Sequence, residues 1–403
     1  MSNTISSLSE VIDSLHATPK YQDDGYSMVR VVDVENDFLS LEGCFKVDKE
    51  TYLNHNKKHH PVRGDIIITR VGSYGMVGYV DIDDKFCLGQ NLSIIHPENI
   101  FDGKFLYYYI LSPFMQKVIY GNIGGSAYKS LGLEEIRKLP LKIEGLNRKR
   151  IGEFLYIIDK KIHTNKKIIS TLESMAKTLY DYWFVQFDFP DANGRPYKTS
   201  GGKMIWNEEL GREIPEGWQI LSLKELASYS TERISSSEMT RQNYVGMDNM
   251  IANRCGIKES EYDPPEGDMI RFKANYILLG NIRPYFKKIW LAGYNGGCSP
   301  DVLAIMPNED SISEFVYTTL SQDTFFDYDT AGAKGTKMPR GDKDHIMSYP
   351  IPWNKKLAII FGERLRAGYK MRNKLMIENK SLTKLRDFLL PMLMNGQVGF
   401  KET

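Results

Sequence analysis

The chain has 403 residues, of which 42% are hydrophobic and 26% are charged, a composition typical of soluble globular proteins. With 52 Lys and Arg against 51 Asp and Glu, its formal net charge is +1, which excludes a histone-like polycation and an acidic disordered tail. The length exceeds that of one compact domain and predicts two or three. Nucleic acid is not excluded as a partner, because binding depends on where the charges lie.

The cysteines and the first residues indicate the cellular setting. Cys44, Cys87, Cys255 and Cys298 occur singly, which predicts neither a disulfide scaffold nor a cysteine zinc site and fits a reducing compartment. The first ten residues lack the basic and apolar segments of a signal peptide. Since no apolar stretch approaches the roughly 20 residues of a membrane span, we expect a soluble, cytoplasmic protein.

The second half of the chain repeats the first at a shift of 210 residues. Gly89–Pro97 matches Ser299–Pro307, and the same shift places Pro140 on Pro350 and Gly152-Glu153 on Gly362-Glu363. No gap is needed from Gly89 to Phe184. Each half opens with short β-branched runs between turn residues, which predict strands, and ends with a long helical segment. This pattern predicts an internal duplication.

The predicted elements follow this plan in chain order. Residues 1–144, with the apolar run Ile66–Ile68, form a first mixed domain; residues 145–187 form a central long helix from about Asn147 to Phe187; and residues 188–217, rich in Gly and Pro, form a connector. Residues 218–353, with the run Tyr276–Leu279, form a second mixed domain; residues 354–395 form a C-terminal long helix that stops at Pro391; and residues 396–403 form a tail. The fold class is α/β (mixed α+β): two domains, each a small mixed sheet with helices, separated by two long antiparallel helices.

In the first helical segment, apolar residues together with Asn165 recur at alternating spacings of four and three, a heptad seam that packs against another helix. A single Asn in the seam is expected to fix its register. In the second segment, Leu375, Leu382 and Leu389 form one heptad column. The other column is largely polar, with Arg372, Asn379 and Arg386. We expect an antiparallel pair, forming a rod of roughly 55 Å; the alternative is that each helix packs on its own domain. The predicted seam residues are Leu155, Ile158, Ile162, Asn165, Ile169, Leu172, Leu179, Leu375, Leu382 and Leu389.

Several motifs resemble those of one known family. The connector pieces 187–198, 200–204 and 213–218 resemble the central region of type I restriction–modification specificity subunits, and the segment Leu389–Val398 resembles the end of their C-terminal helix. The pieces Gly64–Gly72 and Leu278–Tyr285 are similar to strand–turn pieces of their target recognition domains, although such pieces are weak signals alone. The resemblance covers the whole chain, including the duplication.

The resemblance implies a non-catalytic subunit that reads DNA. Its two mixed domains would be target recognition domains, each reading one half of a bipartite double-stranded site. The helices would hold them at a fixed distance and dock two adenine methyltransferase subunits, which two translocating endonuclease subunits then join. S-adenosylmethionine, Mg and ATP would belong to these partners, and this chain would hold no cofactor. Two different recognition domains held at a fixed distance would require a DNA site with two different half-sites at a fixed spacing.

Candidate DNA contacts lie on loops that the repeat places twice. Gly-rich loops carrying hydroxyls and cations occur at residues 121–130 and 331–340, and a second pair of turns follows the apolar runs. Glycines let a backbone approach DNA closely, and these polar side chains can contact base edges or phosphates. The alternative is that they are solvated surface turns. The candidates are Arg70, Ser73, Tyr74, Ser126, Tyr128, Lys129, Arg283, Tyr285, Lys334, Thr336, Lys337 and Arg340.

The charge is unevenly distributed between helices and domains. Residues 146–187 carry a net +4 and residues 354–390 a net +7, which leaves −10 for the rest of the chain. Acidic recognition domains should have modest affinity for phosphates in isolation. We therefore expect the helices or the partner subunits to supply most of the attraction for DNA; a basic helix face could equally serve an acidic protein surface.

Four motifs could suggest other chemistry. Asp263-Pro-Pro-Glu266 lacks the aromatic residue of adenine methyltransferases, residues 332–337 lack a complete phosphate loop, and residues 342–345 lack an acidic partner for a nuclease. His55, His59 and His60 lie in a Lys-rich stretch without a nearby carboxylate ligand, which favours a solvated loop. The competing hypotheses are a coiled-coil adaptor with two protein-binding heads and a self-sufficient DNA methyltransferase with cryptic motifs.

Overall fold

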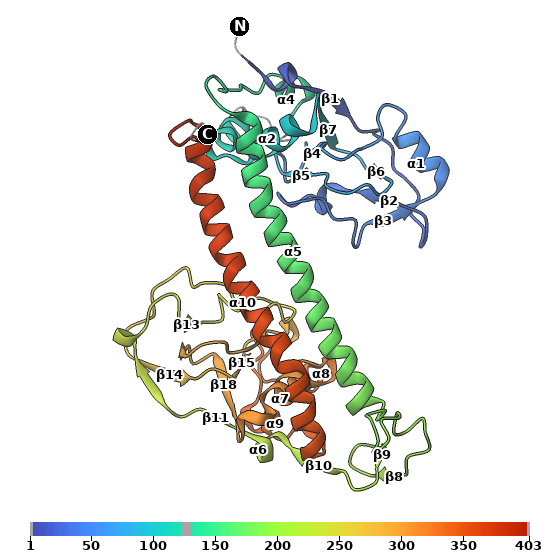
Figure 1. Cartoon of the computed structure of the whole chain (residues 1–403), viewed down its shortest axis with the longest axis vertical. Helices are drawn as coiled ribbons and strands as arrows, with labels where there is room; N and C mark the ends of the chain where they lie inside the picture. Colours follow the sequence, from blue (N-terminus) through green and yellow to red (C-terminus); the bar gives the residue numbers. More distant parts are fainter. Residues whose placement is uncertain (1–2, 122–129, 401–403) are drawn as a thin grey trace. The chain divides into compact units, whose positions relative to one another are not determined.

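The structure, a computed structural model, describes residues 3–121 and 130–400 (Figure 1). It divides into two compact units. Unit 1 consists of residues 1–163 together with 381–403, and unit 2 consists of residues 164–380. Each unit therefore contains one mixed region of strands and short helices together with a part of both long helices.

Unit 1 contains two sheets. The main sheet is antiparallel, with the order β1 (Ser9–Asp13), β7 (Leu92–Pro97), β4 (Ile66–Thr69) and β5 (Val77–Tyr79). The smaller sheet has the order β3 (Phe45–Val47), β2 (Tyr26–Val29) and β6 (Phe86–Leu88), and its strands β2 and β6 are parallel. The short helices are α1 (Lys49–His55), α2 (Ile100–Leu111), α3 (Pro113–Gly121) and α4 (Leu133–Arg137).

Unit 2 repeats this arrangement. Its main sheet has the order β11 (Ala227–Tyr229), β18 (Val302–Pro307), β15 (Ile277–Gly280) and β16 (Ile289–Leu291). Its second sheet has the order β12 (Arg233–Ser235), β14 (Asp268–Phe272), β17 (Gly296–Cys298) and β13 (Tyr244–Val245), again with one parallel pair, β13 and β17. Two strand pairs, β8 (Met204–Asn207) with β9 (Arg212–Pro215) and β10 (Gln219–Ser222) with β19 (Pro350–Trp353), and the helices α6 (Leu223–Leu226), α7 (Ser313–Leu320), α8 (Asp323–Gly332) and α9 (Lys343–Met347) complete it.

The duplication and the mixed α/β fold are both confirmed. The shift of 210 residues carries the start of α3 onto that of α8, the start of α4 onto that of α9, and β7 onto β18. The central strands of the main sheets are apolar on both faces because each face is covered. In β4, Ile66 and Ile68 join the core that contains α2, whereas Ile67 joins a second core toward the smaller sheet. This explains why the two predicted strands have continuous apolar runs instead of alternating patterns.

The repeated position of one glycine pair has a packing reason. In unit 1, a Cβ atom added to Gly152 would lie 2.7 Å from the backbone nitrogen of Phe105 in α2. In unit 2, a Cβ atom at Gly362 would lie 3.1 Å from the backbone oxygen of Ser311. Each long helix thus begins by packing closely against the short helices of its own unit, at the same place in the repeat.

The two long helices are α5 (Arg148–Tyr180) and α10 (Lys355–Met394). Two predicted ends were wrong. The α-helical part of α5 ends seven residues before Phe187, in a π-helical turn over Asp181–Val185, and Phe187 then reverses the chain with a φ of 64°. Helix α10 continues for one turn past Pro391, because Leu393 and Met394 of that turn are buried in the core of unit 1.

Buried polar pairs link α5 to α10 inside each unit, and their order shows that the helices are antiparallel. In unit 2, Asn165 donates to the side-chain oxygens of Glu378 and Asn379, both at 2.8 Å, and Glu173 faces Arg372 at 3.6 Å. In unit 1, the Arg386 Nη1 atom lies 2.7 Å from Asp159 Oδ1.

The predicted seam residues lie along these contacts with graded burial. Five are buried, namely Leu155, Ile158, Ile162, Asn165 and Leu375, and five are half-buried, namely Ile169, Leu172, Leu179, Leu382 and Leu389. The polar column of α10 pairs with polar residues of α5: Arg372 with Glu173, Asn379 with Asn165, and Arg386 with Asp159. Its charges are therefore part of the helix pairing and not of a solvated face.

The pairing of Asp159 with Arg386 can be tested by stability measurements. Asp159 is buried and also accepts a hydrogen bond from Tyr108 at 2.8 Å. Burial raises the pKa of Asp159, and Arg386 opposes that rise. We expect Arg386→Leu to lower the free energy of unfolding by about 3 kcal/mol, because it leaves a buried carboxylate without its cation. Urea denaturation should show a larger loss at pH 8 than at pH 5.

The control also removes the Asp159 carboxylate charge, which Arg386→Leu leaves unpaired, while an amide oxygen still accepts the hydrogen bond from Tyr108. In the double variant Asp159→Asn/Arg386→Leu, most of the lost stability should return. A double variant as unstable as Arg386→Leu alone would contradict this account.

Candidate nucleic-acid interface

In unit 1, the first candidate segment is the turn between β4 and β5. The Arg70 side chain is only 18% exposed. Its guanidinium pairs with Asp13 of β1 at 2.5 Å and donates to the backbone oxygen of Leu131 at 3.1 Å. Ser73 is exposed at the tip of the turn, and Tyr74 is half-buried with its ring 5.4 Å from that of Tyr120. Arg70 thus holds the turn in place, and Ser73 is the side chain it presents to solvent.

The second candidate loop of unit 1 is only partly described. Ser126, Tyr128 and Lys129 lie outside the described residues. The residues that follow them are anchored to the β4–β5 turn, because Val71 and Ser130 form a β-bridge and the Leu131 amide donates to the Arg70 oxygen at 2.8 Å.

In unit 2, the turn after β15 exposes an aromatic pair. Arg283 and Lys287 both have left-handed backbones, with φ of 52°, and enclose a short 3₁₀ turn, Pro284–Phe286. Tyr285 is 48% exposed and its ring packs edge-on against Phe286 at 4.9 Å. Arg283 lies near the same Phe286 ring, 6.0 Å from its centroid. Exposed aromatic rings beside a cation are suited to contact with bases or sugars.

The loop after α8 forms a small hairpin that exposes its predicted residues. Lys334 and Arg340 pair through two backbone hydrogen bonds of 2.8 and 2.9 Å, and Thr336 and Lys337 lie exposed between them. Lys334 pairs with Asp342, lowering the pKa of that carboxyl to about 2, and Arg340 lies 3.0 Å from Asp301. Exposed ion pairs of this kind contribute little, so both cations can exchange their carboxylates for phosphates.

The structure joins the two segments that the sequence identified separately. Ile282 and Arg340 form a β-bridge, and the Arg283 amide donates to the backbone oxygen of Pro339 at 2.7 Å. The bridge is the repeat of Val71–Ser130 in unit 1. The Gly341 amide donates to the Asn281 oxygen as Leu131 does to Arg70. Asn281, and not Arg283, therefore occupies the place of Arg70, so the two arginines are not structural equivalents.

Two further observations correct or extend the predictions from the sequence. Asp342 is the N-cap of α9, accepting from the amides of Asp344 and His345, which accounts for that acidic cluster without nuclease chemistry. The histidine-rich stretch does have a carboxylate partner: His59 lies 2.7 Å from Asp65, which also contacts His96. The sequence alone does not reveal this cluster, because it depends both on the folded path of the loop from His59 to Asp65 and on the pairing of β4 with β7 that adds His96.

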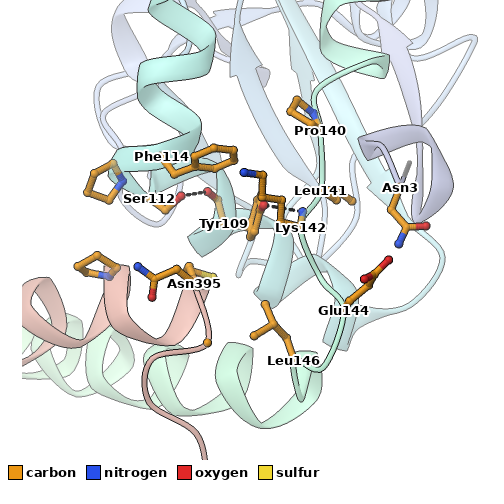
Figure 2. Close-up of a pocket in the computed structure, with 14 residues that line it drawn as sticks. Asn3, Tyr109, Ser112, Phe114, Pro140, Leu141, Lys142, Glu144, Leu146 and Asn395 are labelled. Carbon is orange, nitrogen blue, oxygen red and sulfur yellow. Dashed lines mark hydrogen bonds between the residues drawn. The ribbon is translucent and has the colours of Figure 1, made fainter. Parts of the chain in front are cut away.

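A cavity of about 760 Å³ lies elsewhere in unit 1 (Figure 2). Its wall combines the α2–α3 turn, the segment 140–146 and the last turn of α10. Figure 2 shows Phe114, Leu141 and Leu146 lining it, with the Tyr109 hydroxyl accepting from the Lys142 amide at 2.8 Å. The Ser112 hydroxyl donates to the backbone oxygen of Tyr109 at 2.6 Å, and apolar side chains form much of the lining, so the cavity is suited to packing an apolar side chain.

The chain is similar to one family of known proteins. Residues 5–174 match the family model described as "Type I restriction modification DNA specificity domain". The HindI specificity subunit of Haemophilus influenzae is 21% identical over 83% of this chain and 87% of that protein. The chain is therefore similar to type I restriction–modification specificity subunits, over residues 5–174 for the family model and over most of its length for the HindI relative.

Other relatives match over shorter stretches. The MjaIX specificity subunit of Methanocaldococcus jannaschii is 24% identical over 50% of this chain, and the match spans less than half, 45%, of that protein. The EcoBI specificity subunit of Escherichia coli is 30% identical over 28% of this chain and 24% of that protein. The S subunit structure from M. genitalium shares the fold, with a TM-score of 0.62, 16% identity and coverage of 100% of this chain and 96% of that one.

Two buried polar side chains lie beneath the hairpin of unit 2. Asp329 of α8 is fully buried, and burial raises its pKa to about 7, against a lowering by His345. A Cβ atom at Gly341 would lie 2.5 Å from Asp329 Oδ1 and 2.8 Å from Asn281 Oδ1, so both oxygens converge on the base of the hairpin.

Among the described residues, no helix combines the length and the apolar character that a membrane span requires.

The buried carboxyl of Asp329 makes the stability of the folded chain depend on pH. The folded chain holds the Asp329 proton up to about pH 7, whereas the unfolded chain loses it near pH 4. The free energy of unfolding should therefore fall as pH rises from 4 to 7 and stay level above 7. Asp329→Asn has no charge to bury. Its stability relative to the wild type should be higher at pH 8 than at pH 5 by about 2 kcal/mol. Parallel profiles in thermal or urea unfolding would contradict this.

Proposed function

We propose that this chain is a type I restriction–modification specificity subunit that reads a bipartite double-stranded DNA sequence, one half with each unit. The observation that carries the proposal is a pair of bridged loops that occurs once in each unit, through Val71–Ser130 in unit 1 and Ile282–Arg340 in unit 2. In each unit the bridge lies just after the corresponding strand of the main sheet, β4 or β15. The two pairs share a backbone framework but differ in their side chains, as two readers of different half-sites should. Base edges are distinguished by such side chains, whereas phosphate contacts only position the protein.

The long helices are proposed to set the spacing of the half-sites and to dock the partner subunits. Two adenine methyltransferase subunits would bind along the basic faces of α5 and α10, and two restriction subunits, which cleave and translocate DNA, would join through them. The excess of Lys and Arg on residues 146–187 and 354–390 supports this role, because partners or DNA near the helices would neutralise it. S-adenosylmethionine, Mg and ATP would be held by the partners, with this chain non-catalytic.

A methylation assay separates this proposal from its competitors. The chain alone should transfer no methyl group, and with methyltransferase subunits it should direct adenine methylation to one bipartite motif. Methyl transfer by the chain alone would favour a self-sufficient methyltransferase. No sequence-dependent shift of duplex DNA with any partner would favour an adaptor of proteins.

The cations of the unit 2 hairpin should contribute to affinity for DNA in the complex with methyltransferase subunits. We expect the combined variant Lys334→Ala/Lys337→Ala/Arg340→Ala to bind about tenfold more weakly or worse, because phosphate neutralisation dominates affinity. The slope of log affinity against log salt should shrink by about 1 for each phosphate that the variant no longer neutralises. Lys273→Ala is the matched control, since Lys273 is also exposed and paired with a carboxylate, that of Glu232. Equal reductions in affinity in both variants would contradict the assignment.

Side chains that read bases should change only one half of the motif. We expect Tyr285→Ala or Thr336→Ala to relax specificity in one half-site while the other half and the spacing stay unchanged. Sequencing the methylome of cells that express the complex gives the motif directly. Relaxation of both halves, or no change in either variant, would contradict a reading role for these residues.

A further inference from the structure

The main sheet of unit 1 carries a row of polar side chains that are metal ligands by type. In the antiparallel ladders, Glu10 of β1 lies opposite His96 of β7. Ile66 pairs with Ile95, so Asp65, one residue before β4, is next to His96 on its other side. Side chains in such a cross-strand row share one face of the sheet, with Cβ atoms about 5 Å apart.

A fourth residue reaches this row from a different element. His59, in the loop after α1, places its Nε2 atom 2.7 Å from Asp65 Oδ2, and His96 places its Nδ1 atom 2.7 Å from Asp65 Oδ1. The ligand atoms of His59, Asp65 and His96 all lie within 4.8 Å of one another. Tetrahedral zinc at 2.0–2.2 Å from its ligands holds them about 3.4 Å apart. Small side-chain shifts would therefore admit the ion.

The surroundings prepare the carboxylate and leave an entry path. The Asp65 side chain is 1% exposed, and its Oδ2 atom is oriented by the Val62 amide at 2.9 Å, the kind of supporting contact that metal ligands have. His59 is 16% exposed and His96 38% exposed, so solvent reaches the cluster from the side of His96. A buried carboxylate between two imidazoles suits a divalent cation, which would offset the cost of burying its charge.

We propose that His59, Asp65 and His96 bind one Zn²⁺ ion, which ties the loop after α1 to the main sheet of unit 1. Water would complete the coordination, and Glu10 lies opposite His96 on the neighbouring strand β1. The duplication supplies an internal comparison, because the equivalent row in unit 2 consists of Ser228, Met306 and Tyr276, which offer no such ligand set. The same backbone thus carries ligand side chains in one unit only, and the site belongs to what distinguishes unit 1 from unit 2.

The test uses the full chain without a histidine tag, purified with a chelator and then dialysed against Zn²⁺. Wild type should bind one Zn²⁺ per chain. His59→Gln and His96→Gln should each weaken binding roughly 100-fold or more, since removing a ligand costs at least as much as removing its supporting contact. His16→Gln is the matched control, because His16 lies 3.3 Å from Asp13 in the same unit but outside the cluster; it should bind like wild type.

Thermal unfolding gives an independent reading of the same site. Zn²⁺ should raise the Tm of wild type and His16→Gln, because a ligand bound only by the folded state stabilises it, and should leave the Tm of His96→Gln unchanged. Gln keeps a hydrogen-bond donor for Asp65, so the variants should fold. Two results would overturn the proposal. One is that wild type binds no stoichiometric Zn²⁺ at micromolar concentrations, and the other is that binding persists in both His59→Gln and His96→Gln. In either case the three residues form a hydrogen-bonded cluster only.

Discussion

The pairing of α5 with α10 through buried polar side chains is the constraint on which the rest of the structure depends. Apolar seams tolerate sliding, but a buried charge tolerates only the register that gives it a partner. Asp159–Arg386 sets this register within unit 1, and Asn165–Asn379 sets it within unit 2. The main sheets then attach to these helices through α2 and α7, where Gly152 and Gly362 permit close approach.

Much of this architecture could be predicted from the sequence because repetition and periodicity are local signals. The 210-residue shift showed that the two mixed regions share one arrangement of strands, and the heptad spacing showed where the two long helices lie. Helix ends were less predictable: the turn after Pro391 survives because Leu393 and Met394 are buried by residues far away in the sequence. The polar column of α10 was visible, but its partners on α5 required the register of the pair.

The candidate site was predictable only in part, for the same reason. Glycines, hydroxyls and cations mark the exposed loops, so the hairpin with Lys337 and Thr336 could be found from them. Residue types alone could not show that Arg70 is held by Asp13, or that Asp329 and Asn281 meet beneath Gly341, since those contacts depend on the folded chain. His59 was interpreted as lying in a solvated loop because its contact with Asp65, six residues further along the chain, depends on the folded path of that loop. His96 joins them only through the pairing of β4 with β7.

The interrupted chain path of unit 1 has a consequence for synthesis. Its core includes Leu390, Leu393 and Met394, which follow residue 163 only after all 217 residues of unit 2 have been made. At typical rates of elongation, the first part of unit 1 waits roughly 10–40 s for them. During that time Ile151 and Leu155 lack part of their cover, while unit 2, continuous in sequence, can fold as it emerges. A ribosome that stops after unit 2 therefore leaves a chain in which unit 2 is complete and the core of unit 1 is exposed, a distinct target for chaperones and proteases.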